Sequence, residues 1–313
     1  MNTYTLVIHG GAGTLLKEDM TPKVEKAYLQ ALEEALSAGF AILKSGGTAF
    51  DAVKEATVVL EDNVLFNAGR GSVYTKTGGQ EMDAAIMDGN TLYAGAVAGV
   101  HNVRNPILLA SDVLHHSNHV FLSGEGAMEF ARQRGLKIEP DDYFFSQYRY
   151  DQWQAIKNTD GSALDHGGTP EQIKDKKFGT VGAVACDVNG HIAAATSTGG
   201  MTNKKWGRIG DSPLIGAGTY ASDATCAISC TGHGEVFIRA VAAYDVSCLM
   251  AYKGLTLQQA MDVVVNDKLV KMEGEGGMIG VDAQGNAAMV FNSLGMYRGV
   301  ISSSGLHQVA IYG

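Results

Sequence analysis

The hydrophobic pattern of the first 134 residues predicts strands and helices in alternation. An apolar run over residues 6–9 is typical of a short buried strand, and it ends in Gly10-Gly11-Ala12-Gly13, a predicted turn. A helix is expected to begin at Thr21-Pro22, with Thr as N-cap and Pro at the first helical position, because apolar residues then recur at helical spacing until Gly46. The other elements expected here are helices over 50–60, 107–116 and 126–134, and strands over 81–87, 91–100 and 119–122, the first two joined by a hairpin turn at 88–90.

The second half of the chain repeats this order of paired strands followed by helices. Apolar runs over 180–186 and 191–196 flank Asn189-Gly190, a strong hairpin signal. Helices over 235–251 and 257–268 follow, and then a second hairpin with strands over 278–282 and 287–292. This order favours an α+β fold in which two antiparallel sheets pack between helical layers, although the periodicity is equally compatible with other α/β arrangements.

Between the two halves the pattern weakens. Residues 139–177 are polar, rich in turn-forming residues and aperiodic. We therefore expect a mobile linker over about 139–179, in front of the strand that begins at Thr180.

Composition narrows the classes of function. The 313 residues are 45% hydrophobic and 18% charged, which is enough apolar material for a sizeable core. The formal charge of −9 argues against a nucleic-acid partner. A run of about 18 apolar residues and a signal-like start are both missing, so we expect a cytoplasmic protein with no membrane segment. Thiols of Cys226 and Cys230 on one strand would lie about four rises of 3.3 Å apart, too far for a disulfide, and reduced cysteines are expected.

The junction at Gly179-Thr180 offers a chemistry of its own. Cleavage there would place a threonine at the start of a buried strand, and the new α-amine, with a reference pKa of about 7.7–8.0, could serve as the base for its hydroxyl. Gly179 would let the backbone adopt the strained angles that bring its carbonyl to that hydroxyl. On its own, a Gly-Thr pair is far more often an ordinary junction between loop and strand.

Several longer motifs supply the context for this bond. They are residues 8–13 (Ile-His-Gly-Gly-Ala-Gly), 65–69 (Leu-Phe-Asn-Ala-Gly), 87–90 (Met-Asp-Gly-Asn), 176–185, 196–213 and 229–235. In this order and over nearly the whole chain, the set resembles the plant-type asparaginase and isoaspartyl peptidase family of N-terminal nucleophile hydrolases. The resemblance implies an αββα four-layer sandwich. It also implies cleavage into an α subunit (1–179) and a β subunit (180–313) that stay associated, and a dimer of these αβ pairs.

The resemblance also assigns roles to single residues. Thr180 would be the nucleophile and Thr198 would tune it, while Thr231 and the Gly232 N–H would form the oxyanion hole and Asn67 would support the nucleophile region. Arg208 and Asp211 would hold the α-carboxylate and α-ammonium of the substrate, a role that suits a guanidinium fork and a carboxylate. The complete substrate-binding set comprises Arg208, Ile209, Gly210, Asp211, Thr231, Gly232, His233 and Gly234.

The implied reaction is hydrolysis of β-aspartyl dipeptides and of asparagine through a β-aspartyl ester on Thr180, with no cofactor for catalysis. The ratio of the two activities stays open, and so does the related glycosylasparaginase class, although Gly179 replaces the Asp that usually precedes its nucleophile. His233 stands where relatives commonly have a small polar residue, and we expect it to alter substrate preference or pH dependence. A structural sodium ion is also implied, held by the main-chain carbonyls of Leu60, Glu61, Asn63, Phe66, Ala68 and Arg70.

Other classes of function fit the motifs less well. A nucleotide-binding site would need the early glycines to complete G-x-G-x-x-G or a P-loop, and they do not. His115, His116 and His119 match no zinc signature, and the G-x-S-x-G of a serine hydrolase is absent. A binding protein without activity remains an alternative, and it predicts no self-cleavage.

Overall fold

The computed structural model describes residues 3–159 and 179–313, and in this part the strands form two sheets packed face to face. The larger sheet contains, in spatial order, β12 (His307–Tyr312), β11 (Gly295–Ser302), β1 (Thr5–Gly13), β5 (Val181–Cys186), β6 (Ile192–Thr198), β2 (Met82–Asp88), β3 (Ala94–Val100) and β4 (Phe121–Ser123). The smaller sheet contains β10 (Ala287–Phe291), β9 (Gly276–Asp282), β8 (Cys226–Gly232) and β7 (Thr219–Ala221).

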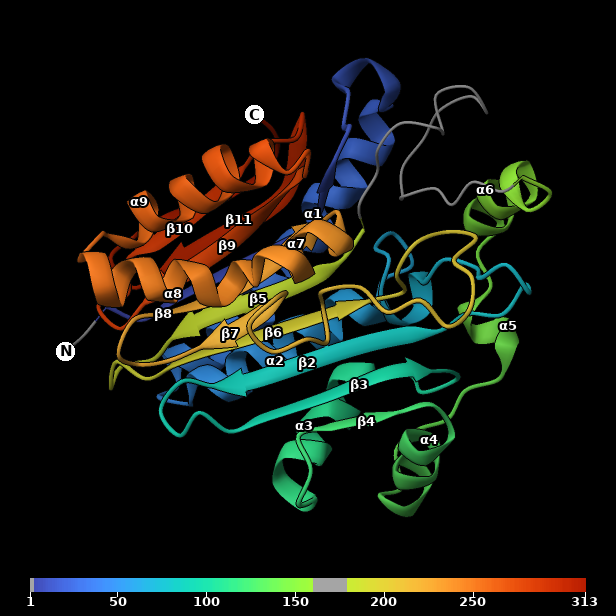
Figure 1. Cartoon of the computed structure of the whole chain (residues 1–313), viewed down its shortest axis with the longest axis horizontal. Coiled ribbons are helices and arrows are strands. Elements are labelled where there is room, and N and C mark those ends of the chain that lie inside the picture. The colour runs from blue at the N-terminus through green and yellow to red at the C-terminus, as the bar shows by residue number, and fades with distance from the viewer. Residues whose placement is uncertain (1–2, 160–178) are drawn as a thin grey trace.

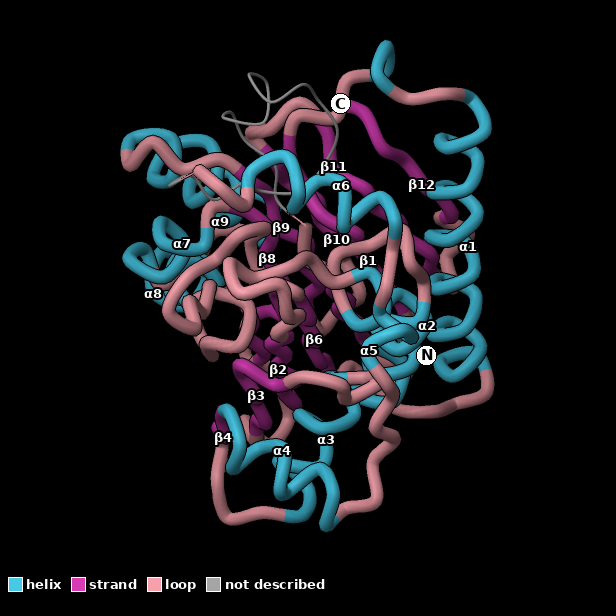
Figure 2. Tube along the Cα trace, turned by 90° about the vertical axis from the view of Figure 1, so that its right-hand side faces the viewer, coloured by secondary structure: helices cyan, strands magenta, loops and turns pink. Residues whose placement is uncertain are grey.

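Helices cover the outer face of each sheet (Figures 1 and 2). The larger sheet is covered by α1 (Pro22–Lys44), α2 (Ala49–Asp62) and α3 (Pro106–His116), with α4 (Gly124–Gln133) beside its β4 edge. The smaller sheet is covered by α7 (Gly234–Ala240), α8 (Ala242–Lys253) and α9 (Leu257–Asp262), which continues as a π-helical turn over Val263–Leu269. The expected αββα sandwich is confirmed, with one difference: β4 pairs with β3 in parallel.

The three interfaces between the four layers each have their own apolar core. In β5, Val181, Ala183 and Ala185 face the helices behind the larger sheet. Val184 and Cys186 face the smaller sheet. A third cluster lies between the smaller sheet and α7–α9. Because β5 is buried on both faces, its sequence is a continuous apolar run without polar alternation, which is why the sequence predicts it well.

The structure corrects two local expectations. The glycines predicted to turn after residue 9 instead belong to β1, which continues to Gly13 with a bulge between His9 and Gly11. The single helix expected over 235–251 is broken at Val241, whose φ of 48° is left-handed, a conformation that a β-branched residue rarely adopts.

The predicted linker also differs from the expectation. Its first part folds into α5 (Asp141–Phe144) and α6 (Gln147–Ile156), so the expectation of a structureless segment is wrong for these residues. Helix α6 buries Arg149 and Ile156 rather than an apolar stripe, so the helical period is missing from its sequence. Residues 160–178 of the predicted linker lie outside the described residues.

The topology brings the predicted site residues to one end of the sandwich. Strands β5 and β6 are antiparallel, with Val181 opposite Ser197, so the start of β5 and the end of β6 meet. Strand β8, which ends in Gly232, packs against both from the facing sheet. All four cysteines are free thiols, as expected. In the described ranges, each helix is too short or too polar to cross a membrane.

Candidate active site

Thr180 lies at this end of β5 with its hydroxyl close to two other oxygens. Its Oγ1 is 2.8 Å from the carbonyl oxygen of Gly179 and 3.1 Å from Oγ1 of Thr198. The Thr198 hydroxyl accepts the N–H of Gly200 at 3.0 Å and donates to the Gly179 carbonyl at 3.0 Å. With the Gly200 donor fixed, Thr198 can accept the Thr180 proton while it passes its own proton to the carbonyl.

The Gly179 carbonyl oxygen also receives a donor from Asn67. The Asn67 amide nitrogen donates at 2.9 Å to Gly179 and at 2.7 Å to the Gly200 carbonyl, while its Oδ1 accepts the Val73 N–H at 3.0 Å. Asn67 itself is fully buried, which strengthens these bonds. Donors gathered on one carbonyl oxygen in a buried site stabilise negative charge that develops there.

His9 supports Thr180 from the neighbouring strand β1. Its Nδ1 is 3.0 Å from the Thr180 carbonyl oxygen, and its Nε2 is 2.9 Å from Oγ of Ser229. Because a carbonyl can only accept, Nδ1 carries the proton. Burial lowers the pKa of His9 to about 3, so the ring is neutral and Nε2 accepts from Ser229. Sequence reasoning named His9 only within a motif; a histidine at the end of an apolar strand was the available signal.

The facing strand β8 contributes Thr231 and Gly232. The Thr231 hydroxyl accepts the Ala12 N–H at 3.3 Å, which leaves its proton available for another acceptor. At Gly232 a Cβ would lie 2.5 Å from the Phe237 ring and 2.6 Å from the Glu275 carbonyl oxygen, so only glycine fits. A small pocket of about 10 Å³ joins both sheets; it is lined by Gly179, Thr180, Thr198, Gly200, Met201, Arg208, Gly210, Asp211, Ser212 and Gly232.

Arg208 lines this pocket and forms a two-pronged ion pair with Glu235. Nε and Nη2 of Arg208 donate to the two carboxylate oxygens of Glu235, each at 2.9 Å. Gly210 makes room for the guanidinium, because a Cβ there would lie 2.9 Å from Nη1. The guanidinium therefore has one edge fixed by Glu235, while Nη1 lies against Gly210 and takes no part in this ion pair. The sequence alone gives no sign of this pair. Glu235 lies 27 positions after Arg208, and charged residues so far apart form no recognisable pattern.

Asp211 is a buried carboxyl in the same pocket. Its side chain is only 4% exposed, and within the described residues its Oδ2 has no hydrogen-bond partner. Burial raises the pKa of Asp211 to about 7, against the opposing charge of Arg208. At Gly234 a Cβ would lie 3.1 Å from Asp211 Oδ1, so this glycine keeps space open beside the carboxyl. A cationic hydrogen-bond donor in that space would lower the pKa of Asp211 again, so that the carboxyl would be ionised.

Four members of the predicted substrate-binding set are not among the residues that line the pocket: Ile209, Thr231, His233 and Gly234. Ile209 is 38% exposed. His233 precedes α7 and lies with Nε2 3.6 Å from Glu235 Oε2, while its main-chain N–H donates to the Glu275 carbonyl at 3.0 Å. His233 can thus influence Arg208 through Glu235.

His115, His116 and His119 belong to no group of three metal-ligating side chains in the described part of the chain.

The loop predicted to hold sodium contains two glycines that lie against main-chain carbonyl oxygens. At Gly69, which has a left-handed φ of 50°, a Cβ would lie 2.5 Å from the Glu61 carbonyl oxygen. A Cβ at Gly71 would overlap the Phe66 carbonyl oxygen. These two glycines let the chain pack closely against the Glu61 and Phe66 carbonyl oxygens, and carbonyl oxygens are suitable ligands for a hard cation. Three of the six predicted carbonyls, those of Leu60, Asn63 and Ala68, accept main-chain N–H groups of the loop itself, and the sodium ion stays a prediction.

The side chain of Glu61 points from this loop region to β6. Its Oε1 accepts the Ser197 hydroxyl at 2.6 Å and the Ile107 N–H at 3.0 Å, whereas Oε2 lacks a hydrogen-bond partner among the described residues. Burial raises the pKa of Glu61 to about 8, so the folded chain keeps this carboxyl protonated at neutral pH.

This protonation predicts a pH-dependent stability. The folded pKa of Glu61 is raised from 4.5 to about 8, so its contribution is fully present below pH 4.5 and is lost as the pH rises through 8. Glu61→Gln carries no proton to lose. We expect its stability relative to the parent chain to improve by a few kcal/mol between about pH 5 and about pH 9, measured by thermal or urea unfolding. A difference that stays constant over this range would show that Glu61 ionises normally in the folded chain.

Comparison with known proteins identifies the family of this chain. Residues 2–311 match the protein family described as Asparaginase. The chain belongs to this family. It is 53% identical to the isoaspartyl peptidase of Salmonella typhimurium over 95% of each chain. It is 50% identical to the isoaspartyl peptidase of Escherichia coli, over 95% of this chain and 92% of the relative. The plant-type L-asparaginase of Pyrococcus abyssi is 44% identical over 92% of this chain and 93% of its own. The resemblance inferred from the sequence motifs is thus confirmed.

Proposed function

We propose that this chain is an isoaspartyl peptidase and L-asparaginase that matures by cleaving its own Gly179–Thr180 bond and then uses Thr180 as an N-terminal nucleophile. The observation that carries the proposal is the Gly179 carbonyl. Its oxygen lies within hydrogen-bond distance of the Thr180 hydroxyl and of two further donors, on Asn67 and Thr198. The names of the relatives at about half identity support the substrate class.

Maturation would proceed as an N-to-O acyl shift. The Thr180 oxygen bonds to the Gly179 carbonyl carbon, its proton passes to Thr198, and the Thr198 proton passes to the former carbonyl oxygen. Asn67 stabilises the charge that develops on that oxygen during the transfer. The C–N bond then breaks as the proton of the new hydroxyl passes to the Thr180 nitrogen and the carbonyl re-forms, which leaves an ester and a free amine. Water hydrolyses the ester to a Gly179 carboxylate and a free Thr180.

Turnover would reuse the same groups on a substrate. In the uncut chain the pocket is too small for a substrate and Gly179 forms part of its wall, so release of Gly179 would open it. The free amine of Thr180 accepts the hydroxyl proton, and the hydroxyl attacks the β-carbonyl of the substrate while Thr231 and the Gly232 N–H stabilise the oxyanion. Arg208 binds the α-carboxylate and Asp211 the α-ammonium. The leaving amine of the substrate takes the proton from the Thr180 ammonium as the C–N bond breaks, and water then releases aspartate from the ester.

The sheet order supports a matured protein whose parts stay together. Strand β1 belongs to residues 1–179, yet it pairs with β11 on one side and β5 on the other, both from residues 180–313. Separation of the two parts would break both ladders and expose the core between them. The proposal includes assembly of two such αβ units into a dimer, and a structural sodium ion in the loop of Leu60–Arg70.

The test follows the purified chain during incubation at neutral pH. We expect the 33.0 kDa chain to give two fragments on a denaturing gel, the smaller of which begins at Thr180 by N-terminal sequencing. Hydrolysis of a β-aspartyl dipeptide should rise in step with the fragments, because cleavage creates the amine that activates the hydroxyl. A chain that stays uncut and hydrolyses the dipeptide at full rate would refute the mechanism.

A further inference from the structure

A fully buried arginine lies in helix α6, within the segment that the sequence predicts to be structureless. Arg149 is 1% exposed. Its Nε donates at 2.9 Å to the Gly71 carbonyl and its Nη2 at 3.2 Å to the Leu65 carbonyl. Nη1 is bonded to Gln152, one turn along the same helix, at 3.2 Å. The guanidinium thus joins α6 to two points on the loop that follows α2.

These two carbonyls stand on either side of Asn67. The Asn67 amide uses both of its protons, on Gly179 and on Gly200, so its placement depends on the path of the main chain from Leu65 to Gly71. The Leu65 carbonyl also receives the Tyr28 hydroxyl at 3.2 Å. Fixing a loop at both ends of a functional residue sets the position of its side chain within the narrow range that such chemistry requires.

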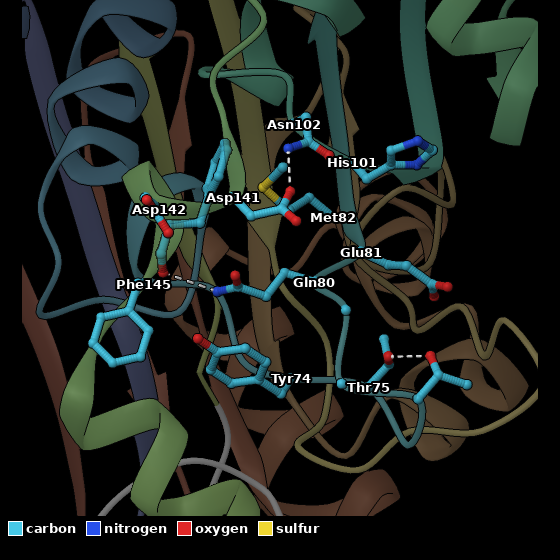
Figure 3. A pocket seen from close by; sticks show the side chains of 14 residues that line it. Tyr74, Thr75, Gln80, Glu81, Met82, His101, Asn102, Asp141, Asp142 and Phe145 are labelled. Atoms are coloured by element: carbon cyan, nitrogen blue, oxygen red, sulfur yellow. Dashed lines mark hydrogen bonds between the residues drawn. The ribbon is translucent and has the colours of Figure 1, made fainter.

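A second contact fastens the same region to the residues after this loop. The Gln80 amide donates at 2.6 Å to the Ser72 carbonyl. It also donates at 3.1 Å to the Phe144 carbonyl of α5 (Figure 3). The Trp153 ring of α6 stacks on Tyr74 with 5.7 Å between ring centres. Helices α5 and α6 are therefore built onto the segment that carries Asn67, and α6 is the last described element before residue 179.

We infer that Arg149 is a positioning residue for self-cleavage: it clamps the Leu65 and Gly71 carbonyls so that Asn67 reaches the Gly179 carbonyl. The inference rests on the proposed function. A planar guanidinium suits this role because its fixed fork reaches two carbonyls at once, whereas a lysine ammonium is a single point of charge.

The first experiment compares rates of cleavage. We expect Arg149→Met and Arg149→Lys to convert into the two fragments at least about tenfold more slowly than the parent chain, because a small displacement of Asn67 weakens the stabilisation of charge on Gly179. The matched control is Gln152→Ala, which removes the neighbour of the guanidinium and keeps both carbonyl contacts; it should cleave within about twofold of the parent. Circular dichroism would establish that each variant is folded. If Arg149→Met does not fold, the comparison is made with Arg149→Lys.

The second experiment does not depend on cleavage. In a Thr180→Ala background with ¹⁵N-labelled asparagine, the Asn67 side-chain NH₂ signal would be assigned by its loss in Asn67→Ala. We expect Arg149→Lys to shift or broaden this signal, while the NH₂ signal of the remote Asn286 stays in place. A purely structural role would instead lower the melting temperature and leave the Asn67 signal unchanged.

These outcomes separate the inference from the proposed function. If the parent chain never cleaves, the proposed function fails, and the Asn67 signal still decides whether Arg149 positions that amide. If the parent chain cleaves and folded Arg149→Lys cleaves at the same rate, or its Asn67 signal is unmoved, the inference about Arg149 is overturned.

Discussion

Thr180→Ala should abolish both self-cleavage and turnover. The alanine side chain cannot form the bond to the Gly179 carbonyl carbon, so the chain should remain a single band at 33.0 kDa after any period of incubation. Hydrolysis of β-aspartyl dipeptides should fall by at least about four orders of magnitude, the scale on which hydrolases lose activity when their nucleophile is removed. The measurement is a denaturing gel run beside an assay for released aspartate.

The controls for this variant use the same position and the same pocket. Thr180→Ser keeps the hydroxyl and should still cleave, with a rate reduced by the greater rotational freedom of serine. The folded state of Thr180→Ala should be intact, because among the described residues the Thr180 hydroxyl bonds only to Gly179 and Thr198. If Thr180→Ala still yields fragments that divide at residue 179, another group performs the cleavage and the proposed mechanism is wrong.

The fold was predictable where strands are buried on both faces or helices carry a clear apolar stripe. Hairpin β5–β6 and helices α1 and α2 were found close to their observed bounds for this reason. Helix α6 was missed because its buried residues include Arg149 and its aromatic side chains have no helical period. The glycines of residues 10–13 were assigned to a turn by local preference, although pairing with β11 holds them in a strand. Contacts between distant segments decided both cases.

The residues of the candidate site could be predicted as positions in sequence motifs. The residues that hold them in place could not. Thr180, Thr198 and Asn67 do meet at one carbonyl, and Arg208 and Asp211 do line one pocket. Glu235 and Arg149 lie outside the set because their roles come from distances across the fold: one fixes an edge of Arg208, and the other holds the ends of a loop. Single-sequence patterns report periodicity and local turns, so contacts between residues far apart in the chain leave no signal in them.

The contact between Arg208 and Glu235 leads to a prediction about substrate binding. Glu235 holds the Nε and Nη2 edge of Arg208, whereas Nη1 lies against Gly210 and takes no part in this ion pair. Burial raises the pKa of Glu235, but the Arg208 hydrogen bonds and charge outweigh this effect and hold the pKa below its usual range. Glu235 is therefore an ionised partner that orients the guanidinium, and the substrate carboxylate would use the remaining edge.

Arg208→Ala should separate recognition from maturation. In the described residues Arg208 has no hydrogen bond to Gly179, Thr180 or Asn67, so the variant should cleave itself at a rate close to the parent. Turnover of β-aspartyl dipeptides should fall by about 10²–10³-fold in kcat/KM, because two charge-assisted bonds to the α-carboxylate are lost. Glu235→Gln is the matched variant: it keeps the shape but loosens the guanidinium, and it should raise KM several-fold with little change in kcat. If Arg208→Ala turns over dipeptides like the parent, the carboxylate is held elsewhere; if Glu235→Gln lowers KM instead, Glu235 competes with the substrate for the guanidinium rather than orienting it.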